Sequence, residues 1–308
     1  MNLIYFKIVL LYLLVPIIIT SQNKETDKVR LFYLGGQSNM SGLGSNSELP
    51  NSLNKEFKNV YIFHGNSEED DGKNGGLGTW QKLKPGHGYG FSSDGKKNVY
   101  SDRFGIELSF AKRLSELYPD EKIALIKYCR SGSSIDSQAA STFGCWEPDY
   151  KGSMGINQYD HYLSTIRYAM KIKDIDSDGI EEQLIPSGII WMQGESDAAH
   201  GKNVALKYYS NLKRLINLIR ASLRLDDLPA VIGKISDSHN DDDGKVWDDG
   251  EIVQQAQEKF AENDKNASIV RSTENYGYSD KWHYDSKGYI DLGKNFADEI
   301  YQLNLKFE

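Results

Sequence analysis

Short apolar runs that alternate with helix-periodic segments are the feature that most constrains the fold of this chain. Five runs have the length and composition of buried strands: Val29–Leu34, Lys122–Tyr128, Ser187–Met192, Ala230–Ile235 and Ala267–Arg271. Runs without polar alternation are typical of parallel strands that are covered on both faces. Apolar residues at helical spacing lie between them, over residues 104–118, 159–170, 205–223, 252–260 and 289–303.

This alternation predicts an α/β fold, a three-layer α/β/α sandwich with a central parallel sheet. Right-handed crossovers place the carboxyl ends of the strands at one edge, where open α/β sheets bind ligands. We expect residues 22–308 to form a single domain, because one core can serve roughly 250–300 residues. No internal repeat or interdomain linker is visible in the sequence.

The first 21 residues differ in composition from the rest of the chain. Lys7 provides a short basic region, residues 8–19 are almost wholly apolar, and Thr20-Ser21 offers small residues for cleavage. This layout predicts a signal peptide over residues 1–21. The alternative is an uncleaved anchor, but Pro16 and the short core argue against it, since a spanning helix needs about 20 apolar residues. We expect a secreted or periplasmic protein with no stable membrane insertion after cleavage.

The charge balance bears on the choice of partner. The chain has 36 basic and 44 acidic side chains, a formal net charge of −8. Nucleic-acid binding depends on Lys and Arg at phosphates, so this composition argues against a nucleic-acid partner. A neutral substrate such as a sugar fits better, and the 19 tyrosines and 5 tryptophans suit stacking on sugar rings.

The sequence has two cysteines, Cys129 and Cys145. In an exported protein they can form a disulfide that closes the loop between them, and the alternative is a pair of buried thiols. Because the histidines are scattered singly, no cluster with zinc-ligand spacing is visible, and we expect no cofactor.

One acidic segment resembles the start of a calcium-binding loop. Asp174, Asp176 and Asp178 alternate before Gly179, but Ile185 occupies the twelfth position, where such loops carry a bidentate glutamate. The alternative to a calcium site is a solvated acidic turn.

Ser38 lies where the first predicted strand ends. The segment Leu31–Gly42 runs from apolar residues through Gly35-Gly36 into Gln37-Ser38-Asn39. An N-cap for the next helix is the ordinary interpretation of such a serine. At the carboxyl edge of a sheet, however, a serine can attack an acyl carbon if a histidine and an oxyanion hole lie nearby. The glycine spacing lets the Ser38 amide face an oxyanion, and it differs from the Gly-x-Ser-x-Gly elbow of α/β-hydrolases.

His283 is the strongest candidate for the base. Asp280 precedes it by three residues, a spacing that lets one short turn present both side chains to the same place. A carboxylate on the second ring nitrogen holds a catalytic histidine in the required tautomer. Asp285 is a rival orienting carboxylate, although its side chain is expected to point away.

Two further strand ends offer oxyanion donors. In Trp191–Asp197 the amide of Gln193 can donate to an oxyanion, and Glu195 and Asp197 can support the site or bind substrate hydroxyls. In Arg130–Ile135 the Gly132 amide is the second candidate donor. The alternative interpretation of both segments is a polar turn at the end of a strand.

These motifs together resemble the SGNH (GDSL-like) hydrolase superfamily, and more closely its sialate O-acetylesterase-like domain, which includes carbohydrate esterase family six and the acetylxylan esterases. The matching motifs are Gly-Gln-Ser-Asn-Met at 36–40, Gly-x-Glu-Leu-x-Phe-Ala at 105–111, Gly-Ser-Ser-Ile at 132–135, Trp-x-Gln-Gly-Glu-Ser-Asp at 191–197 and Asp-x-x-His at 280–283. Ile106 stands where relatives usually carry proline, and Ser131 where they usually carry glycine.

The resemblance implies a flavodoxin-like SGNH fold, with Ser38 as nucleophile, His283 as base and Asp280 as orienting acid. It implies a serine acetylesterase that acts on O-acetylated carbohydrate, either of the acetylxylan type or a sialate O-acetylesterase. A secreted carbohydrate-binding protein without catalysis is the alternative from another class. Gln37 and Asn39, which flank Ser38, are candidates for substrate binding or support.

Two loops interrupt the alternation and carry aromatic residues. We expect residues 64–101 and 141–150 to wall the cleft over Ser38, with Trp80, Tyr89 and Trp146 as candidate sugar platforms. The alternative is that these aromatic side chains only pack the loops onto the domain.

Overall fold

The computed structural model describes residues 27–68, 74–152 and 155–306. The predicted signal peptide lies outside the described residues. Within them, none of the helices is both long and apolar enough to span a bilayer.

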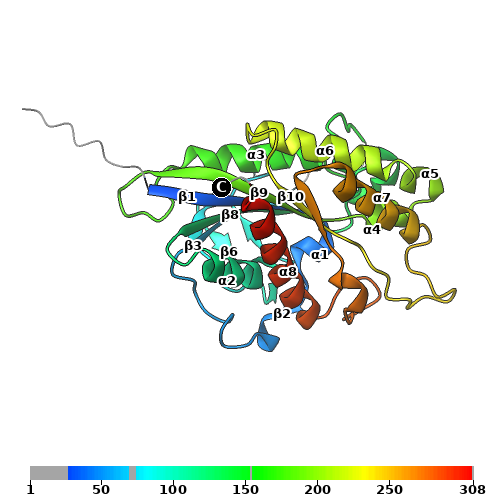
Figure 1. Cartoon of the computed structure of the whole chain (residues 1–308), viewed down its shortest axis with the longest axis horizontal. Coiled ribbons are helices and arrows are strands. Elements are labelled where there is room, and N and C mark those ends of the chain that lie inside the picture. The colour runs from blue at the N-terminus through cyan, green and yellow to red at the C-terminus, as the bar shows by residue number, and fades with distance from the viewer. Residues whose placement is uncertain (1–26, 69–73, 153–154, 307–308) are drawn as a thin grey trace, which may run out of the picture.

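A seven-stranded sheet with the order β11-β10-β9-β1-β8-β3-β4 forms the centre of the molecule (Figure 1). All of its pairings are parallel except that of β4 with β3. Its strands are β1 (Asp27–Gly36), β3 (Val60–His64), β4 (Trp80–Lys82), β8 (Lys122–Cys129), β9 (Glu182–Met192), β10 (Ala230–Gly233) and β11 (Ala267–Val270). The short strands β2 (Gly44–Ser45) and β7 (Arg103–Phe104) pair with each other, as do β5 (Ser92–Ser93) and β6 (Asn98–Val99).

Helices cover both faces of this sheet (Figure 1). The helices are α1 (Ser38–Ser41), α2 (Glu107–Leu117), α3 (Gln158–Lys171), α4 (Glu195–Ala199), α5 (Lys202–Ala205), α6 (Tyr208–Ser222), α7 (Gly250–Asn263) and α8 (Ser286–Asn304). Single 3₁₀ turns are η1 (Asn46–Glu48), η2 (Ser137–Ala139), η3 (Ser141–Phe143) and η4 (Ser272–Asn275). Helices α2 and α8 pack together on one face, and α3, α6 and α7 lie on the other. The predicted three-layer α/β/α sandwich is confirmed.

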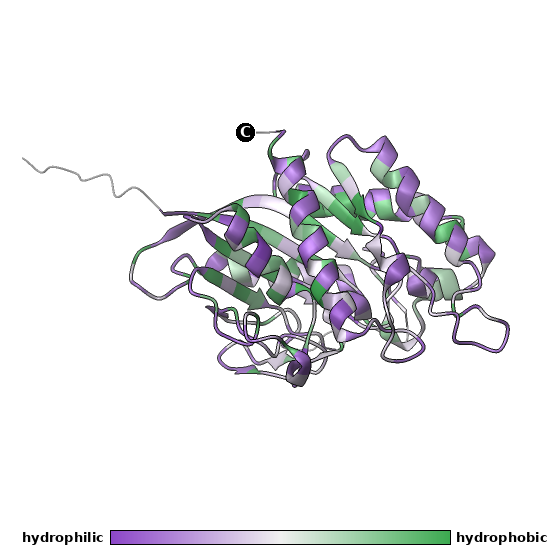
Figure 2. Cartoon of the chain, turned by 60° about the horizontal axis from the view of Figure 1, so that its bottom comes forward, coloured by the Kyte–Doolittle hydropathy of each residue, from purple (hydrophilic) through white to green (hydrophobic). Residues whose placement is uncertain are grey.

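Hydrophobic residues concentrate on the strands and on the helix faces turned toward them (Figure 2). The five predicted strands and the five predicted helical segments all form. The sequence analysis missed β3 and β4, which lie at the edge of the sheet. Strand β3 is short, and β4 has one buried residue, Trp80, followed by two exposed ones, so neither leaves a long apolar run.

The ends of three adjacent strands lie level, and this places the candidate residues together. Gly36 at the end of β1 is in register with Cys129 of β8 and Met192 of β9. The segments that follow these positions begin at Gln37, Arg130 and Gln193. Gly36 has a φ of 144°, and a Cβ there would lie 1.9 Å from the Met192 carbonyl oxygen, so the close approach of the strands requires glycine.

At two places the sequence left alternatives open, and the structure favours one of them. The possible disulfide is absent, because Cys129 and Cys145 are both free buried thiols. Cys129 ends β8, whereas Cys145 is held in β-bridges to Ser134 and Asn157. Burial raises the pKa of Cys129 to about 11 and that of Cys145 to about 12, so both thiols stay protonated at neutral pH.

The weak calcium candidate at Asp174, Asp176 and Asp178 is better described as an acidic turn that pairs with a lysine. Asp174 accepts hydrogen bonds from the amides of Asp178 and Gly179. Lys122 Nζ lies 2.7 Å from Asp176 and 3.2 Å from Glu182, so one ammonium group offsets part of the negative charge of this cluster.

Candidate active site

Ser38 begins the four-residue helix α1, directly after β1, and is buried. The preceding turn is fixed by a hydrogen bond of 2.9 Å from the Gln37 amide to the Met192 carbonyl. Gln37 Oε1 accepts hydrogen bonds from the amides of Gly194 and Ser196, at 3.2 and 3.3 Å. The position of Ser38 therefore follows from the register of β1 with β9.

His283 lies on the loop between η4 and α8, and Asp280 holds it at both the ring and the backbone. Asp280 Oδ2 lies 2.7 Å from His283 Nδ1, and Oδ1 accepts hydrogen bonds from the amides of Trp282 and His283. Partial burial acts to raise the pKa of Asp280, but the hydrogen bonds from His283 and the Trp282 amide outweigh it and lower the pKa. Asp285, the rival carboxylate, instead caps α8 at Gly288.

Ser38 and His283 line one pocket of about 600 Å³. Its other lining residues are Gln37, Leu43, Tyr89, Ser131, Gly132, Ser141, Phe143, Ser196, Ala199, His200, Trp247 and Trp282. Among the described residues no hydrogen bond joins Ser38 to His283, although both line this pocket. Catalytic hydrogen bonds are often long before substrate binds and tighten in the complex.

Asn39 joins the turn at Ser38 to the loop that carries His283, which is called the histidine loop below. Its Nδ2 donates to Glu195 Oε1 at 2.8 Å and to the Trp282 carbonyl at 3.3 Å. Its Oδ1 accepts from the Tyr284 amide and the Tyr289 hydroxyl. Asn39 is buried and does not line the pocket, so it supports the site and does not bind substrate.

Glu195 is the buried carboxylate at the centre of this arrangement. Its Oε1 accepts the hydrogen bond from Asn39, and its Oε2 is buried without a hydrogen-bond partner among the described residues. Burial raises the pKa of Glu195, and the nearby charge of His283 acts in the opposite direction. The carboxyl group supports the histidine loop through Asn39, which donates both to Glu195 and to the Trp282 carbonyl.

The structure does not place Gln193 as an oxyanion donor. Its side chain is fully buried, and Nε2 donates to the Ser133 carbonyl at 3.2 Å and to Asp197 Oδ2 at 2.7 Å. Both amide protons are therefore used within the protein, and Gln193 is absent from the pocket lining. The prediction that its amide reaches the oxyanion is wrong for this geometry.

Asp197 and Gln193 instead shape the loop that carries Gly132. Asp197 accepts hydrogen bonds from the amides of Ile135 and Asp136. Burial raises the pKa of Asp197 to about 6, although these amides and Gln193 favour its charged form. The supporting role expected for Asp197 fits this geometry, whereas a contact with substrate hydroxyls does not.

Gly132 lines the pocket with a φ of 74°. A Cβ at this position would lie 2.6 Å from the ring of Phe143, so glycine is required beneath that ring. Within the described part of the chain, neither the Gly132 amide nor the Ser38 amide donates to a protein acceptor. Both donors are available to a bound oxyanion.

The aromatic residues divide into core and rim. Trp80 packs on Phe63 and donates from its indole nitrogen to the Ala169 carbonyl, and Trp146 is wholly buried between Tyr128 and Trp191. Neither tryptophan can act as a sugar platform. By contrast, Tyr89 is 56% exposed and lines the pocket, as do Phe143 and Trp282, which are 43% and 47% exposed. The sequence analysis missed Phe143 and Trp282, and the neighbours of Phe143 are polar and small.

Lys127 and Glu107 form a second support that sequence reasoning missed. Lys127 Nζ donates to Glu107 at 2.8 Å and to the carbonyls of Ser41 and His87, with both side chains fully buried. This ion pair ties the end of α1 to α2 and to the residue 64–101 loop. The Gly-x-Glu motif at 105–107 contains Glu107. Its ion-pair partner Lys127 lies 20 residues further along the chain and belongs to no motif that pointed to the pair.

Comparison with solved structures identifies relatives of the same fold. A protein from Arabidopsis thaliana is 19% identical with a TM-score of 0.61, and the match covers 89% of this chain and 98% of that one. A carbohydrate acetylesterase from Xanthomonas citri is 17% identical with a TM-score of 0.59, over 90% of this chain and 57% of the other. NanS is 16% identical with a TM-score of 0.58, over 92% of this chain and 98% of its own.

No curated protein matches the chain. The family model described as carbohydrate esterase, sialic acid-specific acetylesterase matches residues 28–302, a range that includes all the motifs at the strand ends and the Asp280–His283 pair. The chain therefore belongs to this family of carbohydrate esterases.

Proposed function

We propose that the protein is an exported carbohydrate O-acetylesterase that uses Ser38, His283 and Asp280 in an acyl-enzyme mechanism. The observation that carries this proposal is the pocket that Ser38 and His283 share, with Asp280 on the far nitrogen of the imidazole. A carboxylate in that position keeps the other ring nitrogen directed toward the nucleophile and stabilises the imidazolium that forms. The N-terminal sequence supports export.

In the first step Ser38 Oγ attacks the acetyl carbonyl carbon while His283 takes the hydroxyl proton. The amides of Ser38 and Gly132 hold the oxyanion, and each such donor typically contributes ~3 kcal/mol to the transition state. His283 then protonates the departing sugar oxygen, which leaves an acetyl group on Ser38. In the second step His283 activates water, which attacks the acetyl carbonyl and releases acetate and free Ser38.

Gln37 is the third polar group at the oxyanion side of the pocket. Its Oε1 is held by the amides of Gly194 and Ser196, which leaves Nε2 for a substrate oxygen. In this proposal Gln37, expected from the sequence to bind substrate or support the site, takes the oxyanion-donor role predicted for Gln193. The exposed rings of Tyr89, Phe143 and Trp282 provide the apolar rim for a sugar ring in place of Trp80 and Trp146.

Hydrolysis of an aryl acetate by the wild type and the Ser38→Ala variant tests the mechanism. Loss of a triad member typically costs on the order of 10⁴-fold or more in rate, so we expect Ser38→Ala to be inactive while keeping the wild-type melting temperature. Ser41→Ala, which changes another buried serine of α1, is the control and should retain activity. Near-wild-type turnover by Ser38→Ala would refute the mechanism. A non-catalytic carbohydrate-binding protein, the alternative from another class, predicts no turnover by either chain.

A further inference from the structure

Tyr89 lines the catalytic pocket with a ring that is 56% exposed. Within the described ranges, its side chain takes part in no hydrogen bond, ring stack or cation–π contact. The direction of the ring therefore depends on the backbone of the turn that carries it, residues 86–91. What fixes this turn also fixes one wall of the pocket.

The backbone around Tyr89 is attached to the end of helix α1. The Tyr89 amide donates to the Gly42 carbonyl at 2.8 Å, and the Gly42 amide donates to the Ser38 carbonyl at 2.8 Å. Two residues before Tyr89, the His87 carbonyl accepts a hydrogen bond of 2.8 Å from Lys127 Nζ. The turn is thus tied down on both sides of Tyr89.

Lys127 joins this turn to α1 through a single ammonium group. Lys127 lies on β8 and is fully buried. Its Nζ donates to the Ser41 carbonyl at 2.9 Å, and to the His87 carbonyl and Glu107 Oε2, both at 2.8 Å. An ammonium group has three donors and no acceptor, so all of its hydrogen-bonding capacity is used. One acceptor ends the helix that carries the proposed nucleophile, and another begins the turn that carries the rim tyrosine.

Glu107 holds this ammonium group from the side of α2. Its Oε1 accepts from the Gly105 amide at 2.9 Å, and Gly105 packs against Gly42, where a Cβ would lie 2.1 Å from the Gly105 Cα. A buried ion pair is often no more stabilising than packed apolar side chains of similar volume. The pair differs from such side chains in direction, because it points N–H donors at two carbonyl groups.

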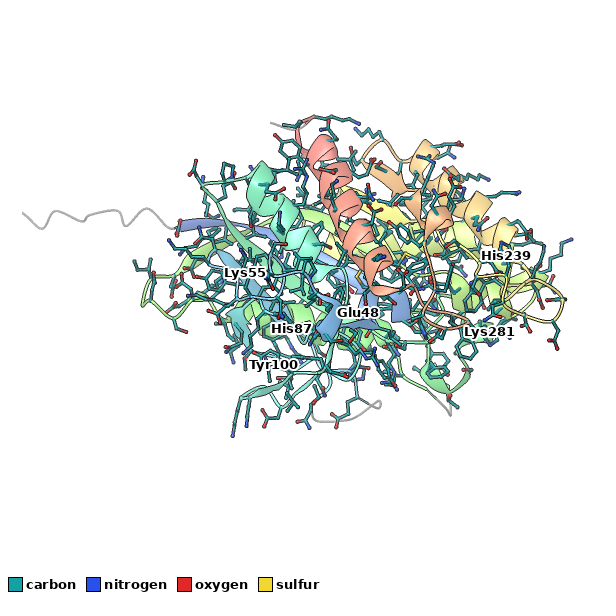
Figure 3. All side chains as sticks on the ribbon, turned by 90° about the horizontal axis from the view of Figure 1, so that it is seen from below. Glu48, Lys55, His87, Tyr100, His239 and Lys281 are labelled. Carbon is teal, nitrogen blue, oxygen red and sulfur yellow. The ribbon has the colours of Figure 1, made fainter. Side chains whose placement is uncertain are left out.

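The rings of the same turn pack separately from this polar contact. His87 stacks on Phe91 with a centroid distance of 4.9 Å and meets the edge of Tyr100 at 5.3 Å. Neither ring nitrogen of His87 has a hydrogen-bond partner in the part of the chain that the structure describes. Figure 3 shows His87 beside Tyr100 and well away from Lys281 and His239. The turn is therefore held independently of the histidine loop, to which Lys281 belongs.

We propose that Lys127 is a positioning residue that sets the place of Tyr89 relative to Ser38, and thereby the binding of the sugar part of the substrate. The inference rests on the proposed function and deepens it, because it names a residue outside the pocket lining that controls how the pocket binds. The register of β1 sets Ser38 by itself. Loss of the ammonium group should therefore displace the rim and leave the nucleophile in place.

The Lys127→Met/Glu107→Gln variant tests the proposal, because it removes both charges and keeps an amide oxygen for Gly105. The ratio of kcat/KM on an acetylated oligosaccharide to that on an aryl acetate should fall about 10-fold, mainly through KM. Lys122→Met/Glu182→Gln makes the same changes in an ion pair at the start of β8 and is the matched control. The control should keep the wild-type ratio, and an equal fall in both variants would overturn the proposal.

A double-mutant cycle separates positioning from a general weakening of the fold. In the Tyr89→Ala background, Lys127→Met/Glu107→Gln should change the ratio by no more than about 2-fold, since the ring that it displaces is absent. The same loss in both backgrounds would overturn the proposal. So would an equal loss in Glu107→Gln alone, because Lys127 there keeps N–H donors for both carbonyls.

Hydrogen exchange tests the placement of Tyr89 without any turnover. In the wild type the Tyr89 amide should exchange slowly although its side chain is exposed, because the Gly42 carbonyl accepts its hydrogen bond. In Lys127→Met/Glu107→Gln, exchange over residues 86–91 should rise about 10-fold, while β1 stays protected.

Rapid exchange of the Tyr89 amide in the wild type would overturn the proposal, even if the paired variant did not fold. Unchanged exchange over residues 86–91 in a folded paired variant would also overturn it. An inactive wild type that shows the expected exchange pattern would refute the esterase mechanism and keep the positioning of Tyr89 by Lys127.

Discussion

Ser38 and His283 line the same pocket, yet the segments that carry them are held in different ways. The turn at Ser38 follows the central strand β1, and its position is set by main-chain pairing with β8 and β9. His283 lies on a loop with exposed neighbours, and Ser38 and its turn are buried. The register of the strands thus sets the position of Ser38, the proposed nucleophile. Side-chain hydrogen bonds set the position of His283, the proposed base.

The histidine loop is held by contacts with residues outside it. Asn39 holds the Trp282 carbonyl and the Tyr284 amide, and Ser238 Oγ donates to the Lys281 carbonyl at 2.7 Å. Lys281 also pairs with Asp241 of the residue 236–250 loop. We therefore expect the position of Ser38 to tolerate substitutions around it. The position of His283 should be sensitive even to substitutions that leave the sheet intact.

Replacement of the base is expected to have the largest effect. His283→Ala should lower kcat/KM for an aryl acetate on the order of 10⁴-fold, because it removes the base proposed to take the Ser38 proton. His200 is the matched control, since it lines the same pocket but its Nδ1 contacts the Ser196 carbonyl and not a carboxylate. His200→Ala should retain activity within a few-fold. The reverse pattern would assign the base to His200.

Removal of the bridge between the two segments should have an intermediate effect. Asn39→Ala should lower kcat about 10–100-fold through misplacement of His283. It should also cost about 2–4 kcal/mol of unfolding free energy, because buried partners lose their hydrogen bonds. Tyr289→Phe removes the hydroxyl that donates to Asn39 Oδ1 but leaves the other contacts of Asn39 in place, so it serves as the control, with little change in kcat. Stopped-flow turnover and thermal unfolding measure the two effects, and loss of stability with unchanged kcat would show that the bridge does not position the base.

Substitution of a rim residue should act on large substrates alone. Tyr89→Ala should lower kcat/KM on an acetylated oligosaccharide about 10-fold and leave a small aryl acetate unchanged, since the exposed ring can stack on a sugar. Trp146→Ala should act in the opposite manner, with about 3–5 kcal/mol less stability and similar effects on both substrates. Equal losses for Tyr89→Ala on both substrates would show that this ring only packs the loop.

A lower pH should decrease the free energy of unfolding through His87, which lies in the residue 64–101 region. Burial, with the charges of Lys127 and Lys84, lowers the pKa of His87 from 6.5 to about 3. The unfolded chain therefore binds the proton more tightly, so stability is complete above pH 6.5 and declines as the pH falls toward 3. At about pH 5 the share of this loss due to His87 should be about 2 kcal/mol, and His87→Phe should remove that share while the contribution of the buried His64 remains. Urea unfolding at about pH 5 and pH 7.5 gives the difference, and an equal pH dependence in the variant would refute this account.

The sequence predicted five of the seven strands of the sheet, the long helices and the position of Ser38, because these depend on local periodicity and on the order of the strands. It also placed Asp280 beside His283, since three residues separate them. It could not show that Gln193 points into the protein, because Ser133 and Asp197, which take its amide protons, come from other segments. For the same reason, composition could not distinguish the buried Trp146 from the exposed Tyr89.

Covalent labelling of the nucleophile tests the central claim most directly. An aryl phosphonate that mimics the ester should react with the active-site serine, and peptide mass spectrometry should find one adduct, on Ser38. The His283→Ala variant should label far more slowly, because the base no longer activates the hydroxyl. An adduct on another serine, or labelling of Ser38 at the same rate in the His283→Ala variant, would contradict the proposed assignment of nucleophile and base.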